Sequence, residues 1–403
     1  MKRRVLYSAC LAALVSAALG SAGASARVDA TPGATPGVTP TSILIGGTVP
    51  LTGAASAYAS IGRGADAYFK YLNARGGVNG RRITYRILDD AYNPALTVQQ
   101  TRQLVQEEKV FAVFNSLGTE HNLAIRPFLN QMQVPQVFAA TGASTFGTDY
   151  RRYPWTIGYQ PSYVAEGAMY GRYLVGQRPG ARVAVLVQND DYGKDLVNGL
   201  RQGLGKSGRI VAQEGYEATA TDVSSQIAKL KDSGARNLVL VATPAFAIRA
   251  YIAVNKLGWK PQIIVNTVAS ATNTMKIAAL SSGQVAEGSV SVGFLKDPTD
   301  PRWSKDAGIR LYRQIMKQYG SGDANDVYNV YAMASAHTFV TALRKAGKNL
   351  TRESLIRALT SLDERDNPFL LPGVTVRTSA TDRFPIEQVR LQRWTKGRWT
   401  LVS

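Results

Sequence analysis

The stretch Ile43–Asp90, which reads ILIGGTVPLTGAASAYASIGRGADAYFKYLNARGGVNGRRITYRILDD, decides the fold. It opens with a short apolar run of strand length that ends at Pro50, because proline cannot continue a strand ladder. A helix is predicted next, since apolar residues recur at helical spacing at Ile61, Ala65, Tyr68 and Leu72. Gly76-Gly77 ends this helix, and Arg82–Leu88 alternates apolar and polar residues like a strand. Strand, helix and strand in this order predict a βαβ unit, and therefore a parallel sheet.

The loop Leu51–Ser60 follows the first predicted strand, at the edge where open α/β sheets bind ligands. It consists of small and hydroxyl-bearing residues, has one aromatic residue, Tyr58, and carries no charge. Such a loop suits a neutral or carboxylate-bearing small molecule better than a nucleotide.

The alternation of strands and helices continues along the 403 residues and restarts after an irregular stretch at Tyr153–Pro161. A chain of this length favours two lobes over one core. We therefore predict an α/β fold of two doubly wound parallel-sheet lobes, joined by a hinge that the chain crosses more than once. A second crossing is expected at Glu287–Phe294, and helices are expected over Trp303–Tyr319, Val327–Ala346 and Arg352–Leu362. The expected lobes are residues 42–157 plus 290–378 and residues 158–289 plus 379–403, the latter ending in a β-hairpin that turns at Lys396-Gly397.

The first 26 residues are expected to be a secretory signal peptide. Lys2-Arg3-Arg4 is a positively charged start, and the apolar segment Val5–Leu19 is shorter than the roughly 20 residues of a membrane-spanning helix. Small residues at 24–26 form a cleavage site, so we expect cleavage after Ala26 and a periplasmic protein. Residues 27–41, rich in Thr-Pro and Pro-Gly pairs, are expected to be a flexible leader.

Charge and cysteine usage narrow the class of protein. Loss of the signal peptide would lower the net charge from +19 to +16 and remove Cys10, the one cysteine of the chain. A mature protein without cysteine has neither a disulfide nor a thiolate metal site. The basic residues are scattered along the sequence, which favours a solvated basic surface over a nucleic-acid interface. We expect a monomer that does not bind nucleic acid.

Enzyme signatures are missing from the sequence. There is no GxGxxG after a strand, no GxxxxGK[ST], no HExxH and no GxSxG. The two histidines, His121 and His337, are far apart, each on a predicted helix. We therefore expect no catalytic residues, no metal and no cofactor.

Two further loops with hydroxyl groups and glycine follow successive strands, at Asn115–Thr119 and Thr141–Thr145. A glycine-containing turn before a helix exposes backbone N–H groups to an anion, and a hydroxyl adds a donor. The alternative is ordinary helix capping by Ser or Thr. Three such loops at one sheet edge favour a ligand site.

Three motifs resemble the leucine/isoleucine/valine-binding protein family, the type I solute-binding proteins of ABC importers. They are PLTG, GRGADAYFKYLNARGGVNGRRI, and DDAYNP beginning at Asp89. The resemblance extends from Ile43 to the C-terminus, and it implies a non-enzymatic protein that delivers its ligand to membrane permease subunits. The stretches NSLGT, ATGA, QNDDYGKD and LKDPTDP are similar to a subgroup associated with aromatic or aliphatic carboxylates.

The resemblance also implies site residues. Ser116 matches a serine that binds the ligand carboxylate, and Tyr192 matches an aromatic residue that closes over the ligand. The loop after the next strand would add backbone and hydroxyl groups, with either Thr141 or Ser144 as the hydroxyl donor. Tyr58 and Tyr163 would form extra walls. The full set of ligand-binding residues expected is Tyr58, Ser116, Ala140, Thr141, Gly142, Ser144, Tyr163, Tyr192 and Val268.

One departure from the family bears on the ligand. Amino-acid-binding members hold the ligand ammonium with a glutamate after the strand equivalent to Gln262–Val265, and here Val268 stands in its place. Burying an ammonium group without a carboxylate is expensive. We therefore expect a small carboxylate-bearing ligand without an amino group. The alternatives are an amino-acid binder that uses Asp190 or Asp191 for the ammonium, the ligand-sensing partner of a signalling receptor, and an exported α/β enzyme.

Overall fold

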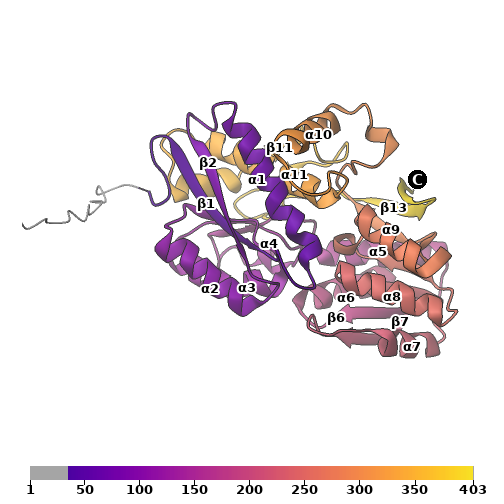
Figure 1. The fold of residues 1–403 in the computed structure, drawn as a ribbon. Helices are drawn as coiled ribbons and strands as arrows, with labels where there is room; N and C mark the ends of the chain where they lie inside the picture. The colour runs from indigo at the N-terminus through magenta and orange to yellow at the C-terminus, as the bar shows by residue number, and fades with distance from the viewer. Residues whose placement is uncertain (1–34, 403) are drawn as a thin grey trace, which may run out of the picture. The chain divides into compact units, whose positions relative to one another are not determined.

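The computed structural model describes residues Thr35 to Val402 (Figure 1). The expected signal peptide, and the expected leader as far as residue 34, lie outside the described residues. The described chain forms two main α/β sheets and one two-stranded sheet.

The first sheet is entirely parallel, with the strand order β2-β1-β3-β4-β5. Its strands are β1 (Ser42–Val49), β2 (Arg82–Asp89), β3 (Ala112–Phe114), β4 (Gln136–Ala139) and β5 (Thr156–Gly158). The helices in this part of the chain are α1 (Ala59–Asn73), α2 (Pro94–Arg102), α3 (Thr119–Gln131) and α4 (Thr145–Thr148). The opening βαβ unit predicted from the sequence is confirmed, with β1 and β2 paired along their whole length.

The second sheet has the order β14-β13-β10-β9-β8-β6-β7. Its parallel strands are β6 (Ala181–Gln188), β7 (Gly208–Tyr216), β8 (Asn237–Val241), β9 (Gln262–Val265) and β10 (Val290–Gly293). The accompanying helices are α5 (Tyr163–Gln177), α6 (Asp191–Leu204), α7 (Ser224–Asp232), α8 (Pro244–Lys256) and α9 (Thr272–Ser282). Successive residues of a strand enter two different cores, with Leu186 in one and Val185 and Val187 in the other. Burial on both faces explains why these strands read as continuous apolar runs.

The predicted C-terminal hairpin is confirmed and completes the second sheet. Strands β13 (Arg390–Thr395) and β14 (Arg398–Leu401) pair antiparallel, and β13 pairs antiparallel with β10. Lys396 and Gly397 form the two-residue turn, both with positive φ, which matches the twist of the flanking strands.

Three helices that follow β10 pack with the first lobe: α10 (Ala307–Tyr319), α11 (Val327–Ala346) and α12 (Arg352–Leu359). Helices α1 and α11 approach closely at Gly64, where a β-carbon would lie 2.9 Å from the Cβ of Ala332. The small sheet of β11 (Asp363–Glu364) and β12 (Val376–Arg377) lies between α12 and the return to β13.

Several element boundaries differ from the prediction. Strand β10 belongs to the second sheet, so that sheet includes residues 290–293, which the expected boundaries assigned to the first lobe. The helix expected from Trp303 begins at Ala307, because the Asp306 side chain accepts a hydrogen bond from Ile309 N and caps it there.

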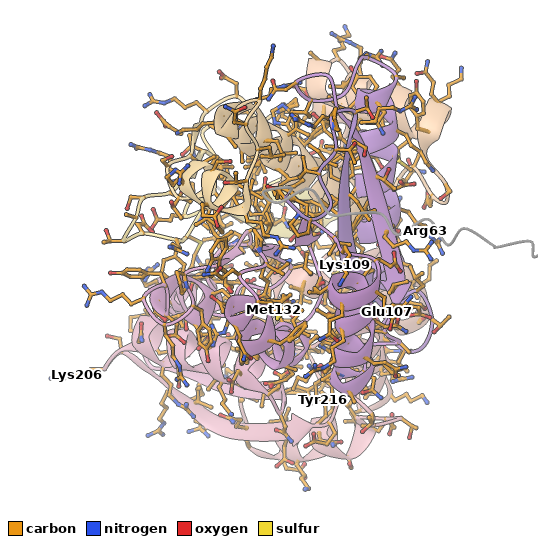
Figure 2. All side chains as sticks on the ribbon, turned by 90° about the vertical axis from the view of Figure 1, so that its left-hand side faces the viewer. Arg63, Glu107, Lys109, Met132, Lys206 and Tyr216 are labelled. Carbon is orange, nitrogen blue, oxygen red and sulfur yellow. The ribbon has the colours of Figure 1, made fainter. Side chains whose placement is uncertain are left out.

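Basic side chains are spread over the exterior of the described chain. Arg63, Lys109 and Lys206 are exposed and come from different parts of both lobes (Figure 2). Between Thr35 and Val402, no helix is long and apolar enough to cross a membrane.

Candidate functional site

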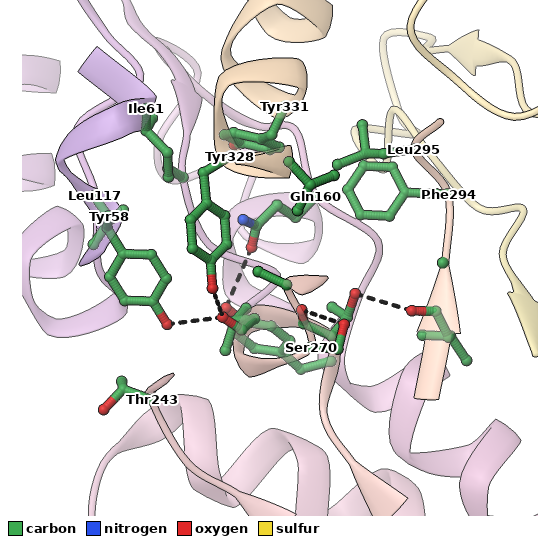
Figure 3. Close-up of a pocket in the computed structure, with 18 of the residues that line it drawn as sticks. Tyr58, Ile61, Leu117, Gln160, Thr243, Ser270, Phe294, Leu295, Tyr328 and Tyr331 are labelled. Atoms are coloured by element: carbon green, nitrogen blue, oxygen red, sulfur yellow. Dashed lines mark hydrogen bonds between the residues drawn. The ribbon is translucent and has the colours of Figure 1, made fainter. Parts of the chain in front are cut away.

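The candidate ligand site is a cavity lined by residues of both lobes (Figure 3). About 920 Å³ of space free of protein atoms lies within it, a volume that includes open solvent at the mouth. Aromatic residues dominate its lining: Tyr58, Tyr92, Tyr163, Tyr192, Phe294, Tyr328, Tyr331 and Trp399.

Charge is scarce on the cavity wall. Of the described residues that line it, Asp297 is the only Asp, Glu, Lys, Arg or His. Its carboxylate already accepts hydrogen bonds from Thr272 Oγ1 and from the backbone N–H and hydroxyl of Thr299, the latter two at 2.7 Å. The remaining polar side chains of the lining are Thr119, Gln160, Thr243, Thr267, Ser270 and Gln392.

Three helices begin at the cavity with uncapped N-termini. The N-cap residues of α3, α8 and α9 are Gly118, Thr243 and Ala271, all on the lining, and none of these described helices has a side-chain cap. The N–H groups of a helix's first turn have no partner within the helix, and the helix dipole places a partial positive charge there. Gly118 has φ +104°, and a β-carbon would lie 2.2 Å from His121 Nδ1, so only glycine fits this turn. Together these N-termini make the wall attractive to an anion.

Tyr192 presents a hydroxyl group without a partner. The side chain lines the cavity, is 4% exposed, and its Oη is a buried atom that makes no hydrogen bond to any described residue. Its ring packs edge-on against Tyr163 with centroids 5.0 Å apart. Burial raises the pKa of the Tyr192 phenol well above its usual value, so the group stays a hydrogen-bond donor at neutral pH.

Five of the nine expected site residues lie on the cavity lining: Tyr58, Ala140, Tyr163, Tyr192 and Val268. They come from both lobes. Each follows the carboxyl end of a strand, which is where open α/β sheets bind ligands.

The other four expected residues are absent from the lining formed by the described residues. Ser116 is 1% exposed, and its hydroxyl oxygen accepts a hydrogen bond from Thr48 N at 3.1 Å, so it joins β1 to the turn after β3. The hydroxyl groups of Thr141 and Thr119 form a hydrogen bond of 2.6 Å with each other. The backbone N–H of Ser144 donates a hydrogen bond to Asp195 Oδ2 of the other lobe at 2.7 Å. The carbonyl of Gly142 accepts from Tyr163 N. As ligand contacts these four residues stay a prediction, and the hydrogen bonds named here are made within the protein.

Asp190 and Asp191, the expected ammonium partners of the alternative reading, also lie off the lining of the described cavity. Asp190 caps α6 by accepting a hydrogen bond from Gly193 N at 2.9 Å, and burial raises the pKa of its carboxyl group to about 6. Asp191 faces Lys194 at 2.8 Å on the surface, and its backbone N–H donates to Glu120 Oε1.

Sequence reasoning missed several lining residues: Tyr92, Gln160, Thr243, Asp297, Tyr328 and Tyr331. Tyr92 and Thr243 come shortly after the carboxyl ends of β2 and β8. Because ligands bind at such strand ends in α/β sheets, the sequence could have identified both residues. Tyr328 and Tyr331 lie on α11, which reaches the cavity only through its packing against α1. No local sequence pattern predicts that packing.

A buried carboxyl group lies behind the second-lobe wall. Glu166 of α5 is 1% exposed and accepts hydrogen bonds from Thr267 N and Tyr170 Oη, each at 2.7 Å. Burial raises the pKa of the Glu166 carboxyl group to about 7. The group supports the short helix η3 (Thr267–Ala269), which carries Val268.

No metal site is evident in the described part of the chain, where no three His, Cys, Asp or Glu side chains are grouped to hold an ion.

Comparison with known proteins places the chain in a family. A family model described as "Periplasmic binding protein" matches residues 42–398. "Leu/Ile/Val-binding protein homolog 1" of Brucella abortus (strain 2308) is 25% identical over 328 residues, which is 77% of this chain and 80% of the relative. The "Amino acid binding protein" of Pseudomonas aeruginosa PAO1 is 23% identical over 310 residues, covering 76% of this chain and 79% of the relative.

Solved structures share the fold. A branched-chain amino acid ABC transporter protein from Thermus thermophilus with bound valine superposes with a TM-score of 0.78 at 20% identity, covering 90% of this chain and 95% of that one. A fatty acid ABC transporter substrate-binding protein from Thermomonospora curvata gives a TM-score of 0.77 at 20% identity, covering 91% and 93%. These two relatives differ in the ligand named for them, so the fold alone does not select one. The chain belongs to the periplasmic binding protein family, in its Leu/Ile/Val-binding type, whose members are solute-binding proteins and not enzymes.

Proposed function

We propose that this protein captures a small carboxylate-bearing ligand in the cavity between its lobes and delivers it to the membrane permease subunits of an ABC importer. The observation that carries the proposal is that three helices without side-chain caps begin on the lining of one cavity, with N-cap residues Gly118 in the first lobe and Thr243 and Ala271 in the second. Positive helix ends that share one cavity are unfavourable unless an anion or water neutralises them.

The unpartnered Tyr192 hydroxyl supports the same ligand chemistry. A carboxylate oxygen accepts hydrogen bonds from both phenols and backbone N–H groups, and such charge-assisted bonds are the stronger kind. Because Tyr192 belongs to the second lobe and Gly118 to the first, one carboxylate bound by both would favour closure of the lobes.

The rest of the cavity suits an apolar ligand body. Ile61, Leu117, Val268, Phe294 and Leu295 line it together with the tyrosine rings. An aliphatic or aromatic acid presents this combination of one anionic end and an apolar remainder.

A second candidate ligand class is an α-amino acid, and Asp297 is the observation that favours it. This carboxylate lies on the lining, unlike Asp190 and Asp191, and could receive an ammonium group. Its three existing hydrogen bonds leave it little further acceptor capacity.

Calorimetry with a matched pair of ligands tests the proposal. Phenylacetate and phenylacetamide share a body and differ in charge, and 4-methyl-2-oxopentanoate extends the test to aliphatic acids. We expect carboxylates to bind at least tenfold more tightly than the amide, and Tyr192→Phe to weaken carboxylate binding about tenfold to a hundredfold by removing one hydrogen bond to a charged group. Equal binding of acid and amide, or no carboxylate binding at all, would contradict the proposal. Leucine binding that Asp297→Asn abolishes would assign the site to amino acids instead.

A further inference from the structure

Two phenol groups of the first lobe meet at one backbone carbonyl of the second lobe. Tyr58 Oη donates to Val268 O at 3.0 Å, and Tyr328 Oη donates to the same oxygen at 2.7 Å (Figure 3). All three residues line the cavity, and the two tyrosines are 4% and 7% exposed.

The two phenols are held as a pair before they reach the second lobe. Tyr58 precedes α1 and Tyr328 is the second residue of α11. Asp326 joins the two segments, since one of its oxygens accepts from Ser60 Oγ at 2.6 Å and the other from Tyr328 N at 2.9 Å. The rings pack edge-on with centroids 5.1 Å apart. Little side-chain freedom is therefore lost when both hydroxyls engage a partner.

The carbonyl group of Val268 is also fixed in position, by hydrogen bonds of the second lobe to its neighbours in η3. In η3, Thr267 N donates to the buried Glu166 at 2.7 Å, and Thr267 Oγ1 donates to Val292 O at 3.2 Å. Ser270 Oγ donates to Thr267 O at 2.9 Å. The acceptor therefore sits on a fixed turn of the second lobe.

The contact has a consequence for the ligand. A carbonyl oxygen has two lone pairs, and two phenol protons occupy both. An ammonium group that entered this part of the cavity would lose its water shell and find no acceptor at Val268, a costly exchange. The carboxyl group of Glu166 lies behind η3, off the lining formed by the described residues, and Asp297 is bound by Thr272 and Thr299.

We propose that Tyr58, Tyr328 and Val268 form an interlobe clasp that supplies the closing hydrogen bonds from protein groups alone and thereby selects carboxylates without an amino group. The inference rests on the proposed function, because it defines the ligand class of the same cavity. Tyr58 and Tyr328 are specificity-determining residues in this scheme.

Binding of one matched ligand pair tests the selection. Leucine and 4-methyl-2-oxopentanoate differ only in the amino or keto group. We expect the wild-type protein to bind the keto acid at least tenfold more tightly than leucine. In the Tyr58→Phe/Tyr328→Phe double variant, keto-acid affinity should fall about fivefold to a hundredfold, because two hydrogen bonds that close the lobes are lost. The ratio of keto-acid to leucine affinity should narrow at least fivefold, since Val268 O is released. An unchanged ratio in the double variant, or tighter binding of leucine by the wild type, overturns the selection.

Tyr85→Phe is the matched control. Tyr85 Oη donates to Phe114 O at 3.1 Å, so it is also a phenol bonded to a backbone carbonyl, but it lies within the first lobe and off the described lining. Its removal should leave both affinities within about twofold of the wild type.

A measurement of the distance between the lobes tests the clasp without any ligand. Spin labels at Glu107→Cys and Lys206→Cys, both exposed and on different lobes (Figure 2), can be placed in a Cys10→Ser background. Relative to the wild type and Tyr85→Phe, the double variant should lose part of the short-distance population. Identical distance distributions in all three proteins overturn the clasp. If the wild type bound no carboxylate, the proposed function would fail, while the distances would still report on the clasp.

Discussion

The helix N-termini at the cavity differ in their side-chain capping from most N-termini elsewhere in the described chain. Helices α2, α6, α10, α11 and α12 each begin with a residue whose own side chain caps the helix: Asn93, Asp190, Asp306, Asp326 and Thr351. None of these five lies on the described cavity lining. The N-cap residues that do lie on it, including Gly118, Thr243 and Ala271, provide no cap. Helices α5 and α7 also lack side-chain caps, with N-cap residues off the lining.

The difference indicates where stability and binding compete. A cap typically contributes about 1 kcal/mol to folding, so three uncapped helices at one place are a local loss of stability. Thr274 N of α9 already donates to Asn273 Oδ1 at 2.8 Å, and Pro244 of α8 has no N–H. The other N–H groups of these first turns are then available to an anionic ligand. An acidic residue added at one of these N-termini should therefore raise stability and lower ligand affinity, whereas removing a cap elsewhere should lower stability and leave affinity unchanged.

The largest effect is expected for Thr243→Asp at the start of α8. The new carboxylate would cap the helix and stabilise the protein without ligand by about 0.5–1 kcal/mol. It would also face a bound carboxylate and repel it, lowering affinity by at least about a hundredfold, because opposed like charges cost several kcal/mol. Calorimetry and thermal unfolding measure the two effects on the same samples.

The control is Thr351→Asp, the same substitution at the N-cap of α12, which is already capped and lies off the lining. Ligand affinity should stay within about twofold of the wild type. A loss of affinity in this variant as large as that in Thr243→Asp would mean that charge acts at a distance, and the comparison of N-termini would fail.

The next largest effect is expected on the pH dependence of stability, through Glu166 in the first turn of α5. A negative charge on this residue would weaken an anion site nearby. Burial raises the pKa of this carboxyl group from an ordinary value of 4.5 to about 7. The folded protein thus holds a proton that the unfolded chain releases between pH 4.5 and 7, so this group makes stability fall as pH rises through that window. From pH 5 to pH 8 the decline should be about 2–3 kcal/mol larger in the wild type than in Glu166→Gln.

Urea unfolding of the two proteins at several pH values checks this slope. The difference between them isolates Glu166 from Asp190, whose raised pKa acts in the same direction, and from His121, whose pKa is lowered by burial. Parallel stability curves for wild type and variant would show that Glu166 is ionised in the fold.

The smallest effect is expected for Thr351→Ala. Thr351 and Ser354 form a reciprocal capping box at α12, so the change should lower the free energy of unfolding by about 1 kcal/mol. Ligand affinity should not change, because the helix begins off the described cavity lining. Weakened ligand binding at unchanged stability would contradict the comparison, because a capped N-terminus off the cavity lining would then serve binding and not stability.

Local patterns in the sequence predicted most of the fold. The βαβ unit of β1, α1 and β2 followed from alternation and helical spacing, and the β13–β14 hairpin followed from Lys396-Gly397. These features depend on residues close together in the chain, where periodicity and turn chemistry act directly. Boundaries were missed where a cap such as Asp306 decided the first helical residue.

The sequence predicted the candidate site as loops at strand ends and as nine named residues, five of which lie on the cavity lining. The turn after β3 was correctly placed at the cavity edge, but Ser116 faces Thr48 while Leu117, Gly118 and Thr119 line the cavity. A shift of one or two residues in a tight turn reverses the direction of a side chain, and local patterns do not resolve that direction.

The sequence by itself determined a two-lobed α/β protein of the Leu/Ile/Val-binding type, because strand and helix periodicity and family motifs are properties of contiguous residues. Only the tertiary structure decided which groups meet at the cavity. Tyr58 and Tyr328 are 270 positions apart and converge on Val268 because α1 and α11 pack closely at Gly64. Such long-range contacts depend on how whole elements pack, and so does the choice of which helix ends stay uncapped for a ligand.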